Sequence, residues 1–150
     1  MGVLIEFMKS GSLSDISIGQ KGKVIESKIG KPVDVVSLGD DLDLCSYGYG
    51  LELYFASEVL NKISIKYDFV SNRFILPDYL EVNEDNKLNG LNSLDDLVRH
   101  MDLSEIEWSI NKIFSDDTTL CLTCNEATNV FYSLDNHHII SIQTMPSEEW

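Results

Sequence analysis

Positively charged side chains are scarce in this sequence. Its 150 residues contain 11 Lys and Arg against 25 Asp and Glu, which gives a formal net charge of −14. Such a negative field repels nucleic-acid phosphates and anionic lipid headgroups, so the composition disfavours direct binding to DNA, RNA or a membrane surface. The same field favours a basic protein partner.

Long apolar runs are missing as well, and the opening segment is not expected to act as a secretory leader. No run reaches the roughly 20 apolar residues that a membrane-spanning helix needs. The opening segment, which contains Glu6, is too short and too acidic for a signal peptide. The three cysteines, an odd number, favour reduced thiols over a disulfide framework. We therefore expect a cytoplasmic protein that folds as a single domain over residues 1–150.

Signatures of catalysis are also missing. The sequence has no Gly-x-Ser-x-Gly elbow and no Gly-Lys-Ser/Thr phosphate loop. Adjacent carboxylates such as Asp95 and Asp96 suit helix caps or solvated loops, and His100 is expected at a helix C-terminus, where a cation is favoured. We expect a protein that is not an enzyme and that binds no cofactor.

Cys121 and Cys124, with His137 and His138, raise the question of a zinc site. Structural zinc requires a Cys-x-x-Cys turn and a second, suitably spaced pair of ligands. Here the cysteines fall in a Thr- and Leu-rich run that is typical of a strand, where positions i and i+3 face opposite sides, and the histidines are adjacent. The pattern favours buried strand cysteines, so we expect no metal. A redox role for the same cysteines would need a helix N-terminus that lowers the pKa of one thiol, and the strand pattern offers none, so we do not expect one.

The acidic excess is concentrated in the second half of the chain. Residues 1–75 contain 8 basic and 10 acidic side chains, whereas residues 76–150 contain 3 and 15. A negative surface serves solubility, but an even distribution would serve it equally well. The bias favours an acidic face that speeds and orients encounter with a positively charged target.

Helical periodicity and capping signals predict three helices. One helix is expected over 20–28, ended by Gly30 and Pro32. Ser93 is expected to cap a short helix, and a second helix is expected to start at Asp102 or Ser104 and to continue to about residue 114. The N-terminal apolar segment is expected to form one helical turn or an edge strand.

Alternation of apolar and polar residues predicts an antiparallel sheet. The residues 51–55 and 63–67 alternate and are joined by a turn at 56–59, which indicates a hairpin. Further strands are expected over 118–124, 130–134 and 139–144. The acidic segment 37–43 is expected to form a loop.

The two halves share an order of helix, strand and hairpin. The Ile-Ser-Ile run at 63–65 recurs at 140–142, and the preceding helices match when Ile29 is set against Phe114. A lone short hairpin is only marginally stable, whereas two units that share one sheet bury a face together. We therefore predict an α+β fold of two tandem helix–strand–hairpin repeats, about 11–69 and 93–145 with a connection at 70–92. They share an antiparallel sheet that has helices on one face and an open face opposite.

A pattern of structural glycines and core positions runs through the first half. Its parts are Ile18-Gly19-Gln20, Val24, Ile29-Gly30-Lys31-Pro32 and an aromatic Tyr47 ahead of a strand that ends at Phe55. This pattern resembles the helix-and-hairpin unit of the small outer-membrane assembly lipoproteins (SmpA/BamE). Its tandem form is similar to the β-lactamase-inhibitor proteins, whose sheet grips an enzyme.

A fuller pattern resembles a family of uncharacterised bacterial cytoplasmic proteins in which Gly-x-Leu-x-x-Ile, Gly-x-Pro and Lys-Tyr-Gly-x-Leu-Glu-Leu-x-Phe recur. Here these motifs stand at 11–16, 30–32 and 46–55. The sequence departs from them by having Ser46 in place of Lys and by the insertion of Tyr49 and Gly50. The resemblance implies the fold and, by analogy, the role of an immunity partner of a polymorphic toxin.

Aromatic side chains among carboxylates form the predicted partner surface, because aromatics anchor interfaces while acids engage Arg and Lys. Trp108 lies off the apolar stripe of its predicted helix; it either contributes to this surface or packs beneath the polar connection that precedes residue 93. The predicted partner-binding residues are Asp40, Asp41, Asp43, Tyr47, Tyr49, Glu52, Tyr54, Asp102, Glu105, Trp108, Asp116 and Asp117.

Two functions fit these patterns. The first is an immunity or inhibitor protein that binds a basic cognate toxin domain and covers a cleft that acts on nucleic acid or nucleotides. The second is a structural or assembly module to which a peptide adds at the sheet edge. A module of the second kind would tolerate charge reversal at Asp116 and Asp117.

Overall fold

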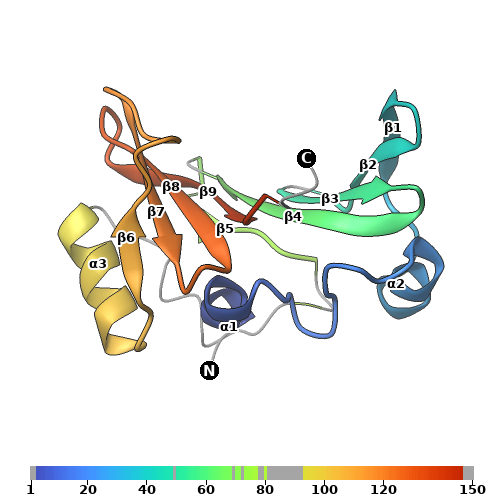
Figure 1. The fold of residues 1–150 in the computed structure, drawn as a ribbon, viewed down its shortest axis with the longest axis horizontal. Helices are drawn as coiled ribbons and strands as arrows, with labels where there is room; N and C mark the ends of the chain where they lie inside the picture. The colour runs from blue at the N-terminus through green and yellow to red at the C-terminus, as the bar shows by residue number, and fades with distance from the viewer. Residues whose placement is uncertain are drawn as a thin grey trace.

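The computed structural model describes residues 3–48, 50–68, 70–71, 73–77, 80 and 93–146. In this part of the chain, three helices lie on one face of an antiparallel sheet (Figure 1). The elements are α1 (Val3–Ser10), α2 (Gly22–Ile29), β1 (Asp34–Gly39), β2 (Leu42–Ser46), β3 (Leu51–Ala56), β4 (Val59–Asp68), β5 (Arg73–Phe74), α3 (Leu94–Leu103), β6 (Trp108–Ile110), β7 (Thr119–Cys124), β8 (Thr128–Ser133) and β9 (His138–Thr144).

The strand order is β1-β2-β3-β4-β9-β8-β7-β6, and β5 pairs with β4 outside this path. The α+β class and the shared antiparallel sheet are confirmed, and the sheet is larger than predicted. In each half of the chain a helix precedes four strands that pair in sequence order, α2 before β1–β4 and α3 before β6–β9. The tandem repeat itself stays a prediction.

The two halves meet where β4 pairs with β9. Ser64 lies opposite Gln143, Ile65 opposite Ile142 and Lys66 opposite Ser141. Beyond these pairs the Ile63 backbone N–H donates a buried hydrogen bond of 3.1 Å to Thr144 Oγ1. Ile63, Ile65 and Ile142 are fully buried, so this seam also forms the centre of the core.

The predicted hairpin and the predicted capping of the third helix are confirmed. In β3, buried Leu51, Leu53 and Phe55 alternate with the more exposed side chains of the opposite face, as the sequence pattern requires. Ser93 Oγ accepts a hydrogen bond of 3.1 Å from the Asp96 N–H and so caps α3. The helix over 20–28 and the three strands of the second half are confirmed within one to three residues.

The acidic segment 37–43 does not form the predicted loop. It contains the end of β1, a tight turn at Asp40 and Asp41, and the start of β2. The turn relies on left-handed backbone at Gly39 (φ 146°) and Asp41 (φ 58°), which glycine and aspartate adopt most readily. Because β1 is exposed on both faces, it lacks the alternation that would reveal a strand.

The helix predicted over about 104–114 is also wrong. Ser104 ends α3, Glu105 takes a left-handed conformation (φ 60°) and β6 follows. The apolar residues whose spacing predicted a helix do not pack together against the core, since Ile110 and Ile113 are exposed. The N-terminal segment, by contrast, forms more than one turn: α1 buries Phe7 and Met8 against β8.

The residue-level match between the halves differs from the predicted one. Both hairpins carry a register shift at the same place, between Tyr54 and Phe55 and between Phe131 and Tyr132. The second hairpin has the longer turn, so Ile63 corresponds in register to Ile142 rather than to Ile140. Phe114 lies in the β6–β7 loop and is no counterpart of Ile29.

Thr128→Val tests how α1 is held against the sheet. The buried Thr128 hydroxyl donates a hydrogen bond of 2.8 Å to the Met8 carbonyl, one of the C-terminal carbonyls of α1. We expect the substitution to lower the free energy of unfolding by about 1–3 kcal/mol, because a buried carbonyl loses its donor. Urea denaturation followed by tryptophan fluorescence measures the change.

The matched control is Thr118→Val. Thr118 is exposed and its hydroxyl donates to Asp116 Oδ1, so its loss should change stability by less than about 0.5 kcal/mol. Equal losses in the two variants would show that the Thr128 bond does not hold α1.

Candidate functional site

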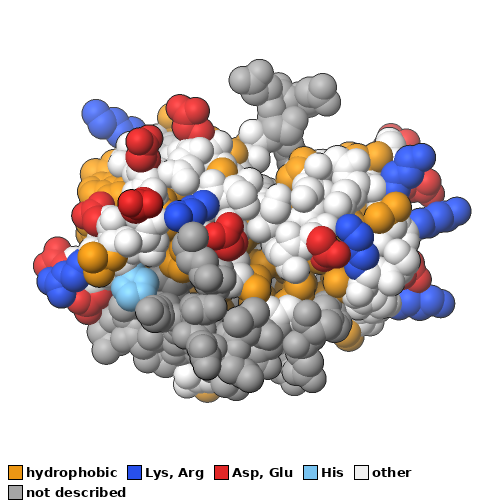
Figure 2. Space-filling model, turned by 90° about the horizontal axis from the view of Figure 1, so that it is seen from below, with side chains coloured by type: hydrophobic (Ala, Val, Ile, Leu, Met, Phe, Trp, Pro, Cys, Tyr) orange, Lys and Arg blue, Asp and Glu red, His pale blue; other side chains and the backbone are white. Residues whose placement is uncertain are grey.

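Charge is distributed unequally between the two ends of the sheet. Figure 2, seen from the helical side, shows charges of both signs at each end, with Lys and Arg side chains more frequent at the end that carries α2 and Asp and Glu side chains more frequent at the end that carries α3 and β6. The basic group consists of Lys21, Lys23, Lys28 and Lys31, in and beside α2. The predicted site residues can therefore act together only where they lie at the same end of the sheet.

The predicted residues of the first half lie on three different surfaces. Asp40 and Asp41 are exposed at the tip of the β1–β2 hairpin. Tyr47 is only 8% exposed and lies with Asp43 on the side of the sheet that faces α2. Tyr49 lies outside the described residues. The structure does not gather these side chains into one face.

Glu52 and Tyr54 lie on the open face, where each has a basic neighbour. Glu52 Oε1 is 2.7 Å from Lys66 Nζ, and the Lys62 ammonium lies 4.8 Å from the centre of the Tyr54 ring. Burial raises the pKa of the Tyr54 hydroxyl, and the Glu52 charge adds to this effect. The hydrogen bond to Glu52 raises the pKa of Lys66. These charges compensate one another, so this patch is not an unpaired acidic surface.

Asp116 has a structural role in the β6–β7 loop. Its Oδ1 accepts hydrogen bonds from the N–H groups of Thr118 (2.9 Å) and Thr119 (2.8 Å) and from the Thr118 hydroxyl. These bonds hold the pKa of the Asp116 carboxyl below its ordinary value, and the bond from the Thr118 N–H makes the largest contribution. Asp117 follows as an exposed side chain.

The end of α3 brings three predicted residues together. The Trp108 indole N–H donates a hydrogen bond of 2.9 Å to Asp102 Oδ1 across the turn that contains Glu105. Trp108 is half-buried and packs against the core. The sequence predicts that these residues are neighbours on one helix, and the α3–β6 turn brings them together instead. Whether Trp108 also packs beneath residues 81–92 lies outside the described residues.

Two further carboxylates, missed by the sequence analysis, adjoin this group. The Asn125 N–H donates to the Glu107 carbonyl (2.7 Å), and the Glu107 N–H donates to Asn125 Oδ1 (2.8 Å). This pairing ties β6 to the β7–β8 turn, where Glu126 is exposed. Glu107 is adjacent to Trp108 in sequence, but Glu126 is brought near by strand pairing alone. We name Asp102, Glu105, Glu107, Trp108 and Glu126 the acidic shoulder.

A hollow of about 460 Å³ adjoins the acidic shoulder at Glu107, Trp108 and Glu126. Its lining includes Glu107 and Glu126 but no Lys or Arg. Among the described residues the ion pairs are Lys28–Asp15 and Lys66–Glu52, so no shoulder carboxylate is neutralised in this way. An indole held by a hydrogen bond beside unpaired carboxylates can contact the aliphatic stem and the charged head of a basic side chain.

The cysteine and histidine cluster considered for zinc does not assemble. Cys121 and Cys124 are both buried in β7, and burial raises the pKa of their thiols to about 11 and about 12. His138 stacks on Tyr67, with ring centres 6.0 Å apart. In the described ranges, no three His, Cys, Asp or Glu side chains are grouped closely enough to hold a metal ion.

The chain matches no protein-family model, no curated protein and no solved structure. The helices of the described ranges are all too short or too polar to cross a bilayer.

The buried thiols predict that stability falls at alkaline pH. In the unfolded chain a cysteine loses its proton near pH 9, whereas folded Cys121 and Cys124 keep theirs to about 11 and about 12. The unfolded state therefore binds fewer protons above pH 9, and stability decreases with rising pH, by up to about 1.4 kcal/mol per pH unit for each thiol. Urea denaturation between pH 7.5 and pH 10 measures this slope.

The double variant Cys121→Ala/Cys124→Ala is the control. Its pH slope should be shallower than that of the unmodified protein, whatever its absolute stability. Identical slopes would show that these thiols titrate alike in the folded and unfolded states.

Proposed function

We propose that the protein is a non-catalytic binding protein of the immunity type, which neutralises a basic toxin domain by covering its positively charged cleft with the acidic shoulder. One observation carries the proposal. Trp108, fixed by its hydrogen bond to Asp102, lies among carboxylates that have no ion-pair partner among the described residues and beside a hollow that no basic side chain lines.

The geometry suits rapid recognition followed by stable contact. Unpaired carboxylates at one end of the molecule attract and orient a basic partner over a distance of about a Debye length, roughly 8–10 Å at physiological salt. A half-buried tryptophan then supplies the apolar anchor. The Asp102 hydrogen bond holds the indole in one orientation before binding, which lowers the ordering cost of association.

The tandem repeat and the cytoplasmic location belong to the same proposal. Support for the repeat comes from the helix and four consecutive strands of each half and from the matching register shifts in the two hairpins. Under this proposal the second unit carries the toxin-binding shoulder. The proposed site keeps Asp102, Glu105 and Trp108 of the predicted residues and adds Glu107 and Glu126.

The acidic shoulder is tested by a pair of charge-matched variants. Glu107→Gln/Glu126→Gln removes two shoulder charges, and Asp40→Asn/Asp41→Asn removes two charges at the far end of the sheet. Stopped-flow association is measured at 50 and 500 mM salt against the basic toxin domain that the proposal requires, which is sought in the reading frames beside this chain's gene. We expect the shoulder variant to associate about tenfold more slowly at low salt and the control to associate normally.

Added salt should slow the association of the unmodified protein and of the control. It should also narrow the difference in association rate between these two proteins and the shoulder variant. Equal effects of the two variants, or an association rate that ignores ionic strength, would contradict the shoulder as the toxin contact.

A second candidate function is favoured by a separate observation. All six residues of β1 are exposed, and among the described residues this strand pairs only with β2, so its outer edge is open to a further strand. Val33, Val35, Val36 and Leu38 expose apolar side chains along it. This edge supports a module to which an extended peptide adds by main-chain pairing.

A further inference from the structure

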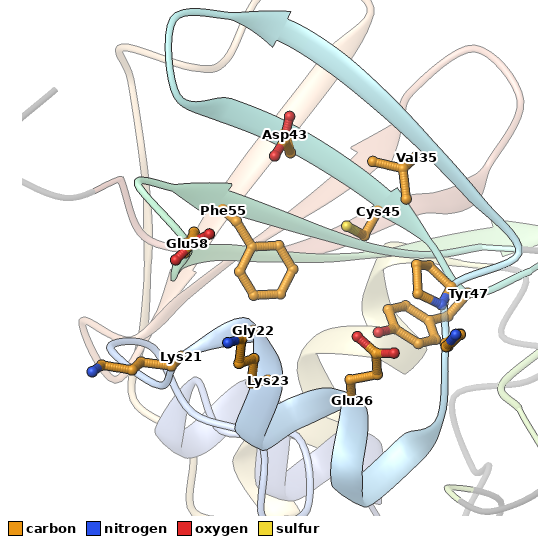
Figure 3. A pocket seen from close by; sticks show the side chains of 12 residues that line it. Lys21, Gly22, Lys23, Glu26, Val35, Asp43, Cys45, Tyr47, Phe55 and Glu58 are labelled. Atoms are coloured by element: carbon orange, nitrogen blue, oxygen red, sulfur yellow. The ribbon is translucent and has the colours of Figure 1, made fainter.

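The strand β1 is exposed on both of its faces as well as along its outer edge. Figure 3 shows Val35 on the side that faces α2, where it borders a groove of about 630 Å³ between that helix and the sheet. Val36 lies opposite Leu44, which in turn lies opposite Tyr54 of the open face. Val35 is 54% exposed and Val36 is 46% exposed. The described part of the chain therefore leaves apolar surface on both faces of this strand partly uncovered.

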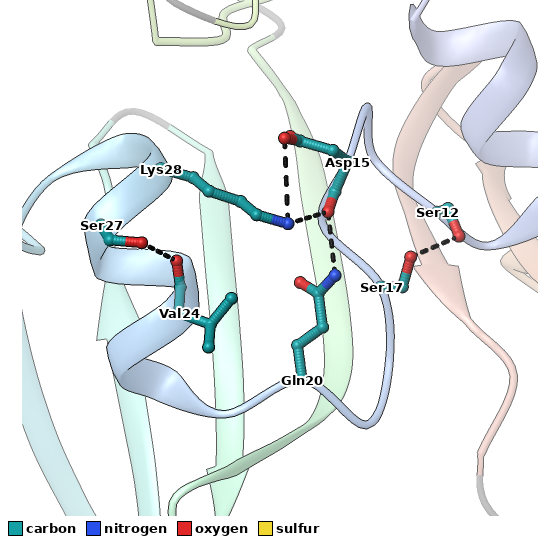
Figure 4. Close-up of polar contacts among 7 residues, drawn as sticks. All are labelled: Ser12, Asp15, Ser17, Gln20, Val24, Ser27 and Lys28. Atoms are coloured by element: carbon teal, nitrogen blue, oxygen red, sulfur yellow. Dashed lines mark hydrogen bonds and ion pairs between the residues drawn. The ribbon is translucent and has the colours of Figure 1, made fainter.

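The segment that leads into β1 is held in place through α2. Figure 4 shows how this helix is anchored: the Asp15 carbonyl accepts hydrogen bonds from Lys28 Nζ (2.9 Å) and Gln20 Nε2 (3.0 Å). At the end of the helix the Gly30 N–H donates to the Glu26 carbonyl (2.8 Å). Because β1 follows directly on this fixed segment, little order has to be gained when another strand pairs with its edge.

Alternate backbone groups of β1 point away from the sheet. The Tyr47 N–H donates to the Leu51 carbonyl (3.0 Å), so the odd-numbered residues of β2 bond toward β3 and the even-numbered residues bond toward β1. Odd-numbered residues of β1 lie opposite odd-numbered residues of β2, and Val35 and Ser37 therefore direct their N–H and C=O groups to the outer edge. The Val35 N–H meets only a local acceptor there, Asp34 Oδ1 at 2.9 Å. A further antiparallel strand would bond to these outward groups.

The charges at the two ends of β1 have opposite sign. Lys31 precedes the strand, Asp40 and Asp41 follow it, and all three side chains are exposed. None of them belongs to an ion pair of the described residues, whereas the nearby Lys28 pairs with Asp15 at 3.8 Å. When two copies of β1 run antiparallel, the lysine of each copy lies beside the aspartates of the other. A parallel arrangement would place like charges together.

One register satisfies the backbone and the charges together. It is centred on Val36, which then lies opposite the same residue of a second copy. On either side of this pair Val35 lies opposite Ser37, so the outward backbone groups of the two copies exchange hydrogen bonds. Further out, Lys31 lies opposite Asp41. Opposed residues are both odd or both even in number, so each face of one sheet continues as the same face of the other.

We propose that two copies of this chain pair through β1 about a twofold axis and form one continuous antiparallel sheet. The halves that meet are the less acidic ones, since residues 1–75 contain 8 basic and 10 acidic side chains and residues 76–150 contain 3 and 15. The opposite edge strand, β6, offers only three residues for pairing.

The dimer goes beyond the function proposed for the acidic shoulder and is independent of it. Both shoulders lie at the outer ends of the joined sheet and stay free, so one dimer would present two of them. A second copy, rather than a foreign peptide, is then the occupant of the β1 edge in the free protein.

Sedimentation velocity between about 5 and about 500 µM protein tests the dimer. We expect the average mass to rise with concentration from 16.9 kDa toward twice that value. Val35→Pro should raise the dissociation constant of the dimer at least tenfold, because proline removes an outward N–H and leaves the bonds to β2 in place.

The matched control is Ile110→Pro in the other edge strand. The Asn111 N–H donates to the Cys121 carbonyl (2.8 Å), so the neighbouring Ile110 N–H points to the outer edge of β6. Ile110 is also 54% exposed, as Val35 is. The control should leave the dissociation constant unchanged. Circular dichroism establishes that both variants are folded.

The paired charges are tested without proline. Lys31→Glu alone and Asp40→Lys alone should each weaken the dimer about tenfold, because each places like charges together at both ends of the paired strands. An equimolar mixture of the two variants should restore the original affinity, since the mixed dimer has opposite charges at both ends.

Several results would overturn the proposal. A mass of 16.9 kDa at every concentration would exclude the dimer, including the case in which an added extended peptide binds to β1 of the monomer. Equal losses in the two proline variants, or a mixture of charge variants no tighter than its components, would exclude pairing through β1 in this register. Masses that grow beyond the dimer would indicate open-ended pairing of β1 with β6.

Discussion

The pairing of β4 with β9 is the contact on which the shape of this molecule depends. Each half alone would be a small four-stranded sheet with one helix beneath it, and the seam joins them through Ile65 and Ile142 into one continuous layer. The buried bond from the Ile63 N–H to Thr144 extends this seam. Because the strands that meet are the last of each half, β1 and β6 become the two outer edges. The β4–β9 pairing thus places the two candidate surfaces, the β1 edge and the acidic shoulder, at opposite ends of the sheet.

Those two ends differ in charge and in how the space under the sheet is filled. At the β6 end Trp108 packs against the core beside carboxylates, whereas at the β1 end the groove between α2 and the sheet is lined by both lysines and carboxylates. A single architecture therefore offers an acidic, filled end and an open end of mixed charge. We propose a basic partner for the first.

The sequence predicts those parts of the fold that are governed by local periodicity. The alternation of Leu51, Leu53 and Phe55 identifies a hairpin, and Ser93 identifies a helix start. β1 escapes this reasoning because it is exposed on both faces and shows no alternation. The α3–β6 turn escapes it because left-handed backbone at Glu105 breaks a stripe that still resembles a helix.

The candidate site was predictable to the extent that it is local in sequence. Asp102, Glu105 and Trp108 lie within seven residues and remain neighbours despite the wrong helix. Glu126 joins them only through the pairing of β6 with β7, which no single sequence reveals. The sequence also suggested that Glu52 and Tyr54 face a partner, but it could not show that Lys66 and Lys62 lie across the neighbouring strand and compensate them.

The central claim is that the acidic shoulder is the surface that meets a basic partner. It is tested most directly by titrating the basic toxin domain into ¹⁵N-labelled protein and following the backbone amide resonances. Shifts gathered at the α3–β6 turn and the β7–β8 turn are the predicted result. Shifts gathered at β1 and α2 instead would contradict the claim, because the partner would then occupy the opposite end of the sheet.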